Sequence, residues 1–261
     1  MICDELREAA APHIDKFLTS TEENSRFVLE QYALGILNLY GLLPYTEFLK
    51  QLTGYLKGSM TKDEIAKGLS NSMLMRQLTF DIEDIYNSVM YVRSPLLLEV
   101  EDLEERLYAH RAIKSLKKFT IEEVLSAGTM PVFYISNPHS DQLKGFMMRK
   151  LGYNEELAEA KIQWLWYAIQ MDENPMSAIV SAIDTKVLSM QELQEVVGIA
   201  VNYCNDCPRW FLKGYSSEEA FVLFQKDKFR KNPPRIVAGP NMKAAGMDIT
   251  PEMQAGIDNL F

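Results

Sequence analysis

Residues 207–221 read Cys207-Pro208-Arg209-Trp210-Phe211-Leu212-Lys213-Gly214-Tyr215-Ser216-Ser217-Glu218-Glu219-Ala220-Phe221, and we expect this stretch to decide how the helical core is closed. The stretch combines a proline, two large aromatic side chains, a glycine and a helix-start signal. We expect Trp210 and Phe211 to plug a helical core and Gly214 to permit a backbone turn. Ser216 and Glu219 have the spacing of a capping box that opens a last helix. The stretch therefore predicts a turn that packs against the helical core through its aromatic side chains and leads into a last helix; we call it the corner.

Two cysteines, Cys204 and Cys207, lie directly at this corner and invite a metal or redox interpretation. A zinc site needs four ligands, and no second cysteine pair exists. A redox dithiol usually opens a helix, whereas this pair ends a predicted one. We therefore favour packing cysteines over a metal or redox role. The histidines lie far from the pair in sequence and lack a neighbouring nucleophile, which argues against catalysis by any of them: His13, His110 and His139.

Upstream of the corner, the second half of the chain has a helical pattern throughout. Ser189 and Glu192 form a capping box, and Asn154 is a helix N-cap. Helices are predicted from Ser140 to Leu151, from Asn154 to Met171 and from Pro175 to Ile183. The strongest amphipathic pattern has apolar residues at i, i+3, i+4, i+7, i+8 and i+11: Leu193, Val196, Val197, Ala200, Val201 and Cys204.

In the first half, the apolar pattern predicts helices at 27–40, 44–56 and 61–69, with Gly41 and Gly58 as helix stops between them. Leu78, Phe80 and Ile82 alternate with polar residues, and Val89, Tyr91 and Val92 form a second short strand pattern, so the two stretches together predict a small β-hairpin. Three helices followed by a hairpin is the layout of a winged helix. The fold class that we expect is all-α, with a winged-helix-like N-terminal half and a helical C-terminal half.

The segment between the two halves predicts a helix from Leu96 to Lys118, a short helix opened by Thr120 and Glu123, and an extended stretch from Met130 to Pro138. The chain is thus divided into five regions. They are an N-terminal arm (1–25), a winged-helix-like region (26–95), connecting helices and linker (96–138), a helical domain (139–225) and an irregular tail (226–261).

Composition excludes several classes of function. The chain has 261 residues and a net charge of -9, which opposes generic attraction to phosphates or anionic lipids. No apolar run reaches the roughly 18 residues of a membrane span, and no signal peptide is recognisable. Three cysteines fit a reducing compartment, so we expect a cytoplasmic protein. The glycines form no phosphate-binding loop, and no cofactor is predicted.

Nucleic-acid binding stays an alternative. The third helix, which would read DNA, carries Lys62 and Lys67 against Asp63 and Glu64 and so has no positive excess. The better candidate for contact with nucleic-acid phosphates is a cluster of basic residues in the tail: Lys226, Lys228, Arg230, Lys231 and Arg235.

The segment Trp210-Phe211-Leu212-Lys213-Gly214-Tyr215-Ser216-Ser217-Glu218-Glu219 resembles the Trp-x-Leu-Lys-Gly-x-Ser/Thr-x-x-Glu signature of a family of uncharacterised helical proteins from low-GC Gram-positive bacteria. The resemblance extends over about residues 26–225 and includes Pro208. It departs at Ser217, where proline is common. Some relatives end in a cysteine-rich zinc-binding SEC-C tail, which this chain lacks. The resemblance implies a fold and no reaction.

Together these patterns predict a non-enzymatic, cytoplasmic interaction or regulatory module with an unknown protein partner. A nucleic-acid-binding regulator is the alternative, and a metal-dependent enzyme is a distant third. The sequence does not indicate an oligomeric state.

Overall fold

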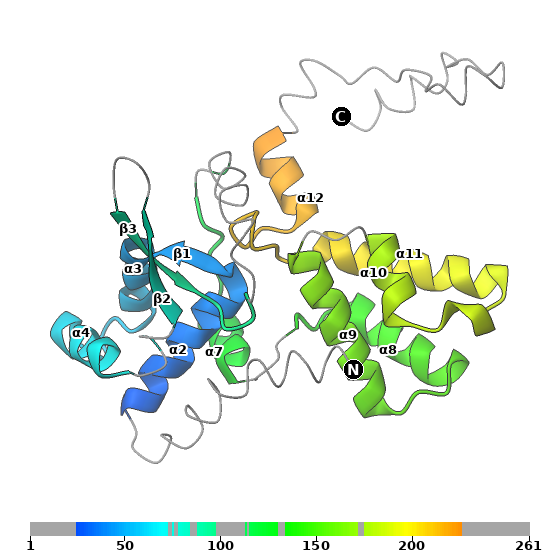
Figure 1. Cartoon of the computed structure of the whole chain (residues 1–261), viewed down its shortest axis with the longest axis horizontal. Coiled ribbons are helices and arrows are strands. Elements are labelled where there is room, and N and C mark those ends of the chain that lie inside the picture. The colour runs from blue at the N-terminus through cyan, green and yellow to red at the C-terminus, as the bar shows by residue number, and fades with distance from the viewer. Residues whose placement is uncertain are drawn as a thin grey trace. The chain divides into compact units, whose positions relative to one another are not determined.

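The computed structural model describes residues 25–72, 75, 78–83, 88–97, 113, 115–129, 134–171 and 175–225. The fold is mainly helical with one small antiparallel sheet, as the sequence predicts (Figure 1). The chain divides into two compact units, Met1–Ser216 and Ser217–Phe261. The predicted N-terminal arm up to residue 24 and the tail from residue 226 lie outside the described residues.

Helix α2 (Ser25–Tyr40) is the centre of the first half. Its side chains are apolar almost all round, and most of those from Leu29 onward are buried, which confirms the predicted burial on several sides. The helix ends at Gly41, whose φ of 73° is a left-handed conformation that glycine adopts without strain.

Helix α7 (Ile121–Thr129) lies against α2 at very short range. A Cβ atom on Gly35 would stand 1.9 Å from the Val124 carbonyl oxygen, and one on Gly128 would stand 2.0 Å from the Gln31 carbonyl oxygen. The two glycines therefore allow the two helix backbones to approach each other directly.

The remaining helices of the first half follow local start signals. Helix α3 (Tyr45–Tyr55) begins directly after Pro44, and α4 (Lys62–Asn71) begins after Thr61. The Thr61 hydroxyl accepts from the Glu64 backbone N–H at 3.3 Å, and Glu64 Oε2 accepts from the Thr61 N–H at 2.7 Å. This reciprocal pair confirms the predicted capping box.

The predicted hairpin is present as β2 (Thr79–Glu83) and β3 (Ser88–Arg93), paired antiparallel. A third strand, β1 (Leu42–Pro44), pairs with the other edge of β3, so the strand order is β1-β3-β2. The sequence did not predict β1. Three residues are too few to show an alternating pattern, and the partner strand is about fifty residues away.

The helix predicted from Leu96 to Lys118 is wrong at its C-terminal end, because the chain from Ser115 to Lys118 is not helical. The Lys117 backbone N–H donates instead to the Lys213 carbonyl oxygen at 3.1 Å. The Tyr55 hydroxyl donates to the Phe119 carbonyl oxygen at 2.9 Å. Contacts with distant residues thus replace the helix hydrogen bonds here. Residues 98–112 of the predicted helix lie outside the described residues.

The second half consists of α8 (Pro138–Lys150), α9 (Glu155–Gln170), α10 (Pro175–Ala182), a 3-10 turn (Thr185–Val187) and α11 (Met190–Asp206). Helix α8 packs against α9 and α11, and α10 packs against the same two helices, so the four form a closed ring of neighbours. The ring encloses the stripe predicted on α9: Ala158, Ile162, Leu165 and Ile169.

The helix starts of this half also follow the sequence. Asn154 and Ser189 are N-caps of α9 and α11, and Glu192 completes the predicted capping box of α11. Helix α8 starts two residues earlier than predicted, because Asn137 caps it and Pro138 occupies its first position.

The second compact unit begins with α12 (Ser217–Ala220), followed by a π-helical turn (Phe221–Gln225). Among the helices of the described residues, none combines the length and the apolar character needed to cross a bilayer.

Candidate functional site

Trp210 occupies the centre of the corner, residues 207–216, which we call the tryptophan clasp. Its side chain is buried, and the indole Nε1–H donates to the Asn38 carbonyl oxygen at 2.8 Å. Its backbone N–H donates to Gln170 Oε1 at 2.9 Å. The indole packs edge-on against Trp166, with ring centroids 5.7 Å apart. One residue therefore contacts the end of α2 and the end of α9.

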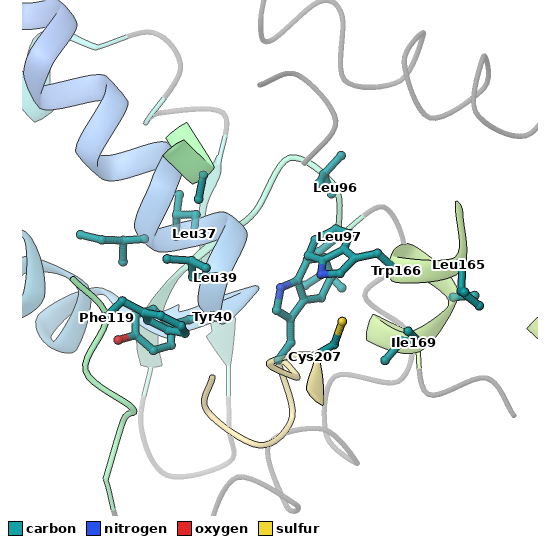
Figure 2. Close-up of a cluster of buried hydrophobic side chains, with 14 of the residues drawn as sticks. Leu37, Leu39, Tyr40, Leu96, Leu97, Phe119, Leu165, Trp166, Ile169 and Cys207 are labelled. Carbon is teal, nitrogen blue, oxygen red and sulfur yellow. The ribbon is translucent and has the colours of Figure 1, made fainter. Parts of the chain in front are cut away.

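Figure 2 shows how the two helix ends approach the clasp. The labelled side chains of α2 lie on one side of Cys207 and those of α9 lie on the other. The cluster in this region belongs to the buried core of the chain and includes Leu37, Leu39, Tyr40, Leu96, Leu97, Leu165, Trp166, Ile169 and Cys207. The clasp thus lies within a continuous apolar cluster.

Gly41 makes room for the indole. A Cβ atom at this position would stand 2.4 Å from two ring atoms of Trp210, far inside van der Waals contact. Its positive φ would also strain any other residue. Gly41 is therefore needed for two separate reasons.

The turn of the clasp is closed by its own backbone. The Arg209 N–H donates to the Tyr215 carbonyl oxygen, and the Gly214 N–H donates to the Arg209 carbonyl oxygen, both at 3.0 Å. Lys213 and Gly214 both have positive φ, at 56° and 85°. The positive φ of Gly214 confirms the predicted role of this glycine in a backbone turn. A Cβ atom there would also collide with the Phe119 ring at 2.8 Å.

The other signature residues are placed around this turn. Pro208 and Ser216 are buried, and Leu212 is half-buried. The Lys213 Nζ donates to the Ile113 carbonyl oxygen at 2.6 Å, and burial lowers the pKa of this ammonium. Glu219 lies in the first turn of α12, in the second compact unit.

Phe211 differs from its prediction. It is half-buried rather than a core plug, and the Arg209 guanidinium lies 5.4 Å from the centre of its ring. Two adjacent residues of a turn point in different directions, so only Trp210 reaches the core.

Cys204 and Cys207 are both buried, with free thiols at the end of α11. Burial raises the pKa of the Cys204 thiol from 9.0 to about 12 and raises the pKa of Cys207 as well. Both thiols are therefore protonated at neutral pH, where a metal ligand or nucleophile must be a thiolate. Within the described ranges no group of three His, Cys, Asp or Glu side chains could hold a metal ion.

His139 lies in the first turn of α8. Its Nε2 is 3.2 Å from Asp206 Oδ2 at the end of α11, and its backbone N–H donates to the Asn137 side chain at 3.0 Å. The histidine therefore joins the ends of two neighbouring helices. His13, His110 and the predicted basic contacts Lys226, Lys228, Arg230, Lys231 and Arg235 lie outside the described residues.

A second feature, which sequence reasoning missed, is an open hollow of about 390 Å³ on the first half. Four of its residues follow one face of α4 at i, i+3, i+4 and i+7, and the others come from α2 and from the turn before α4. We call it the α4 hollow. It is lined by Leu29, Ser59, Met60, Glu64, Lys67, Gly68 and Asn71.

Gly68 shapes the floor of the α4 hollow. A Cβ atom on Gly68 would stand 2.3 Å from Leu29 Cδ2, so the missing side chain lets Leu29 approach α4. The signal in the sequence was this glycine in the middle of a helix, which usually has a packing or functional reason.

Trp210 at the centre of the clasp is buried and no residue of the clasp is fully exposed, whereas the α4 hollow is open to solvent, so the hollow is the better placed of the two for contact with another molecule. No protein-family model, curated protein or solved structure matches this chain.

Proposed function

We propose that the chain is a non-enzymatic interaction module whose residues 25–93 form a winged-helix-like domain that binds a protein partner. The order of elements supports the domain: a helix, a short strand, two helices and a hairpin, with the first strand on the outer edge of the hairpin. In winged helices the third helix and the hairpin are the contact elements, which here correspond to α4 and β2–β3. The comparison is one of fold layout and not of activity.

The observation that carries the choice of partner is the charge of these contact elements. Residues 61–93, which include α4 and the hairpin, carry four basic and five acidic side chains. Binding to nucleic acid depends on lysine and arginine side chains that neutralise phosphates and release counterions. A contact surface without a positive excess suits a protein partner better.

A nucleic-acid-binding regulator is the second candidate, supported by the basic cluster between residues 226 and 235. Fluorescence anisotropy with labelled duplex DNA and single-stranded RNA at about 50 mM salt separates the two, because phosphate binding is strongest at low salt. We expect no binding. Binding that weakens linearly with the logarithm of salt concentration would favour this second candidate.

Photo-crosslinking in cells tests the protein partner directly. A photoreactive amino acid at Ser70, which is exposed on α4, should give protein adducts. The same amino acid at Glu195, which is exposed on α11, is the matched control. Equal adducts at both positions, or none at Ser70, would contradict binding through α4.

The metal-dependent enzyme stays a distant third candidate, and metal analysis of the purified chain tests it. We also propose membership of the bacterial family with the Trp-x-Leu-Lys-Gly signature. Its support is the segment 210–219 and the departure at Ser217 counts against it. In this proposal the protein works in the cytoplasm.

A further inference from the structure

Residues 115–119, which we call the strap, are held in a non-helical conformation by side chains from distant parts of the chain. The Tyr40 hydroxyl, on the last residue of α2, donates to the Lys117 carbonyl oxygen. The Tyr55 hydroxyl, on the last residue of α3, donates to the Phe119 carbonyl oxygen at 2.9 Å. Two helices of the first half therefore bond directly to the backbone of the strap.

The clasp bonds to the same segment from the other end of the sequence. Lys213 Nζ donates to the carbonyl oxygen of Ile113, two residues before the strap, at 2.6 Å. The Lys213 carbonyl oxygen accepts from the Lys117 N–H at 3.1 Å, and the Tyr215 hydroxyl lies 3.2 Å from Ser115 Oγ. The conformation of the strap thus depends on the position of the clasp.

The sequence of the strap favours a different backbone. Ser115-Leu116-Lys117-Lys118 contains three good helix formers, and its apolar spacing continues the helix that the sequence predicts up to Lys118. In an α-helix the Lys117 N–H would donate to the carbonyl oxygen four residues earlier, whereas here it donates to Lys213. The tertiary hydrogen bonds therefore hold the strap against its local preference.

These opposing preferences define two states of one segment. Each hydrogen bond from α2, α3 or the clasp favours the docked state by about two- to tenfold in the equilibrium constant. The helix preference of the strap acts in the opposite direction. We propose that the strap is a conformational switch, docked and non-helical in the state described above, and helical when it leaves the clasp.

Undocking changes the surface at the end of α2. The Phe119 ring packs edge-on against the Tyr40 ring, with centroids 5.3 Å apart, and it also lies against Gly214 of the clasp. Tyr40 is 0% exposed in the docked state. When Phe119 leaves with the strap, the Tyr40 ring becomes accessible to solvent. The switch thus uncovers an aromatic surface at a place remote in sequence from α4, and its test needs no partner.

Chemical exchange saturation transfer NMR of the full chain tests the switch, because it reports the Cα chemical shifts of a minor state populated at about 1%. We expect a minor state in which Ser115 to Lys118 have helical Cα shifts. Tyr55→Phe and Lys213→Met each remove one donor to the docked segment, and each should raise the minor population about two- to tenfold.

Tyr45→Phe is the matched control for Tyr55→Phe. Tyr45 is on the same helix and is likewise half-buried, but its hydroxyl bonds to no strap residue that the structure describes. The minor population should stay within about twofold of the unaltered chain. An increase equal to that of Tyr55→Phe would show a general loss of stability and would overturn the switch.

Two substitutions of Lys118, which is exposed, test whether the minor state is helical. Alanine favours a helix over glycine by about fivefold, so the minor population should be about fivefold higher in Lys118→Ala than in Lys118→Gly. An undocked strap without structure would favour glycine instead, because glycine gains more freedom when it is released. That order, or coil-like Cα shifts in the minor state, would overturn the switch.

The chain that combines Tyr55→Phe with Lys213→Met gives the most sensitive version of the test. Its minor population should exceed that of either single variant, and the absence of a minor state there would overturn the switch. Unchanged shifts in α9 and α11 show that each variant is folded. If the combined chain does not fold, Tyr55→Phe alone decides the outcome by the same criteria.

Discussion

The indole Nε1 of Trp210 donates a 2.8 Å hydrogen bond to the carbonyl oxygen of Asn38, 172 residues earlier in the chain. The same indole meets the Cα of Gly41 closely enough to leave no space for a Cβ atom. This single side chain connects the end of α2 with the clasp, so its replacement should affect the whole core.

Trp210→Ala is expected to lower the free energy of unfolding by about 3–5 kcal/mol, as a large core truncation. Trp210→Phe retains an aromatic ring but lacks the Nε1 donor, so it should cost about 1–3 kcal/mol for the lost buried hydrogen bond. Urea denaturation measures both. An unchanged free energy in Trp210→Ala would show that the clasp is not part of the core.

Gly41→Ala should destabilise the chain by about 2–5 kcal/mol, because it combines backbone strain with a collision against the indole. Gly58→Ala is its matched control. Gly58 also has a positive φ, of 93°, but nothing lies within 4 Å of its Cβ position. Gly58→Ala should therefore lower the free energy of unfolding only through backbone strain, by about 1–2 kcal/mol. Equal losses at the two sites would contradict the close approach of Trp210.

Gly128→Ala should destabilise the chain by about 1–3 kcal/mol, since its Cβ atom would overlap the Gln31 carbonyl oxygen. Gly198→Ala in α11 should instead stabilise it by about 0.5–1 kcal/mol, because nothing lies near that position and alanine restricts the unfolded chain. Thermal unfolding monitored by circular dichroism should show melting temperatures that move in opposite directions.

Gln170→Leu should lower the free energy of unfolding by about 2–4 kcal/mol, because it removes two buried hydrogen bonds. Gln170 Nε2 donates to the Pro208 carbonyl oxygen at 3.0 Å, and Gln170 Oε1 accepts from the Trp210 backbone N–H. Gln194→Leu, at an exposed position of α11, should change stability by less than about 0.5 kcal/mol. If chemical denaturation gives similar values for both, the clasp is not held by Gln170.

Stability should fall at alkaline pH because of the buried thiols. The pKa of Cys204 is raised from 9.0 to about 12, so between these values the unfolded chain releases a proton that the folded chain keeps. The free energy of unfolding should then decrease by up to about 1.4 kcal/mol per pH unit from this thiol. Its contribution is intact below pH 9 and is lost as the pH rises toward 12.

Cys204→Ala isolates this effect. The variant should be less stable at neutral pH, through lost packing, but its stability should decline less steeply above pH 9. Urea denaturation at a series of pH values from 7 to about 11 gives the slopes. Parallel slopes in the two proteins would contradict the buried position of the thiol.

The local features of the fold could be predicted from sequence because neighbouring residues decide them. The capping boxes at Thr61 and Ser189, and the helix stop at Gly41, each depend on a few consecutive residues. The hairpin β2–β3 was likewise visible, in alternating apolar residues for β2 and in a short apolar run for β3. Such signals need no knowledge of distant contacts.

The features that sequence reasoning missed depend on contacts between distant residues. Ser115 to Lys118 has a helical pattern but bonds to the clasp, about a hundred residues away. Strand β1 exists only because β3 pairs with it. Leu29 packs against α4 beside the hollow because Gly68 has no Cβ atom, and no local pattern reveals that these two residues meet. Tertiary contacts outweigh local preference at each of these places.

The space that Gly41 leaves for Trp210 also has a consequence for biosynthesis. The ribosome makes α2 and Gly41 long before it reaches residue 210, so a nascent chain that stops short of the clasp lacks the side chain that covers the end of α2. Such a chain should be cleaved readily by protease near Asn38, and extension past the clasp should protect it. The first half is therefore completed by one of the last core residues to be synthesised.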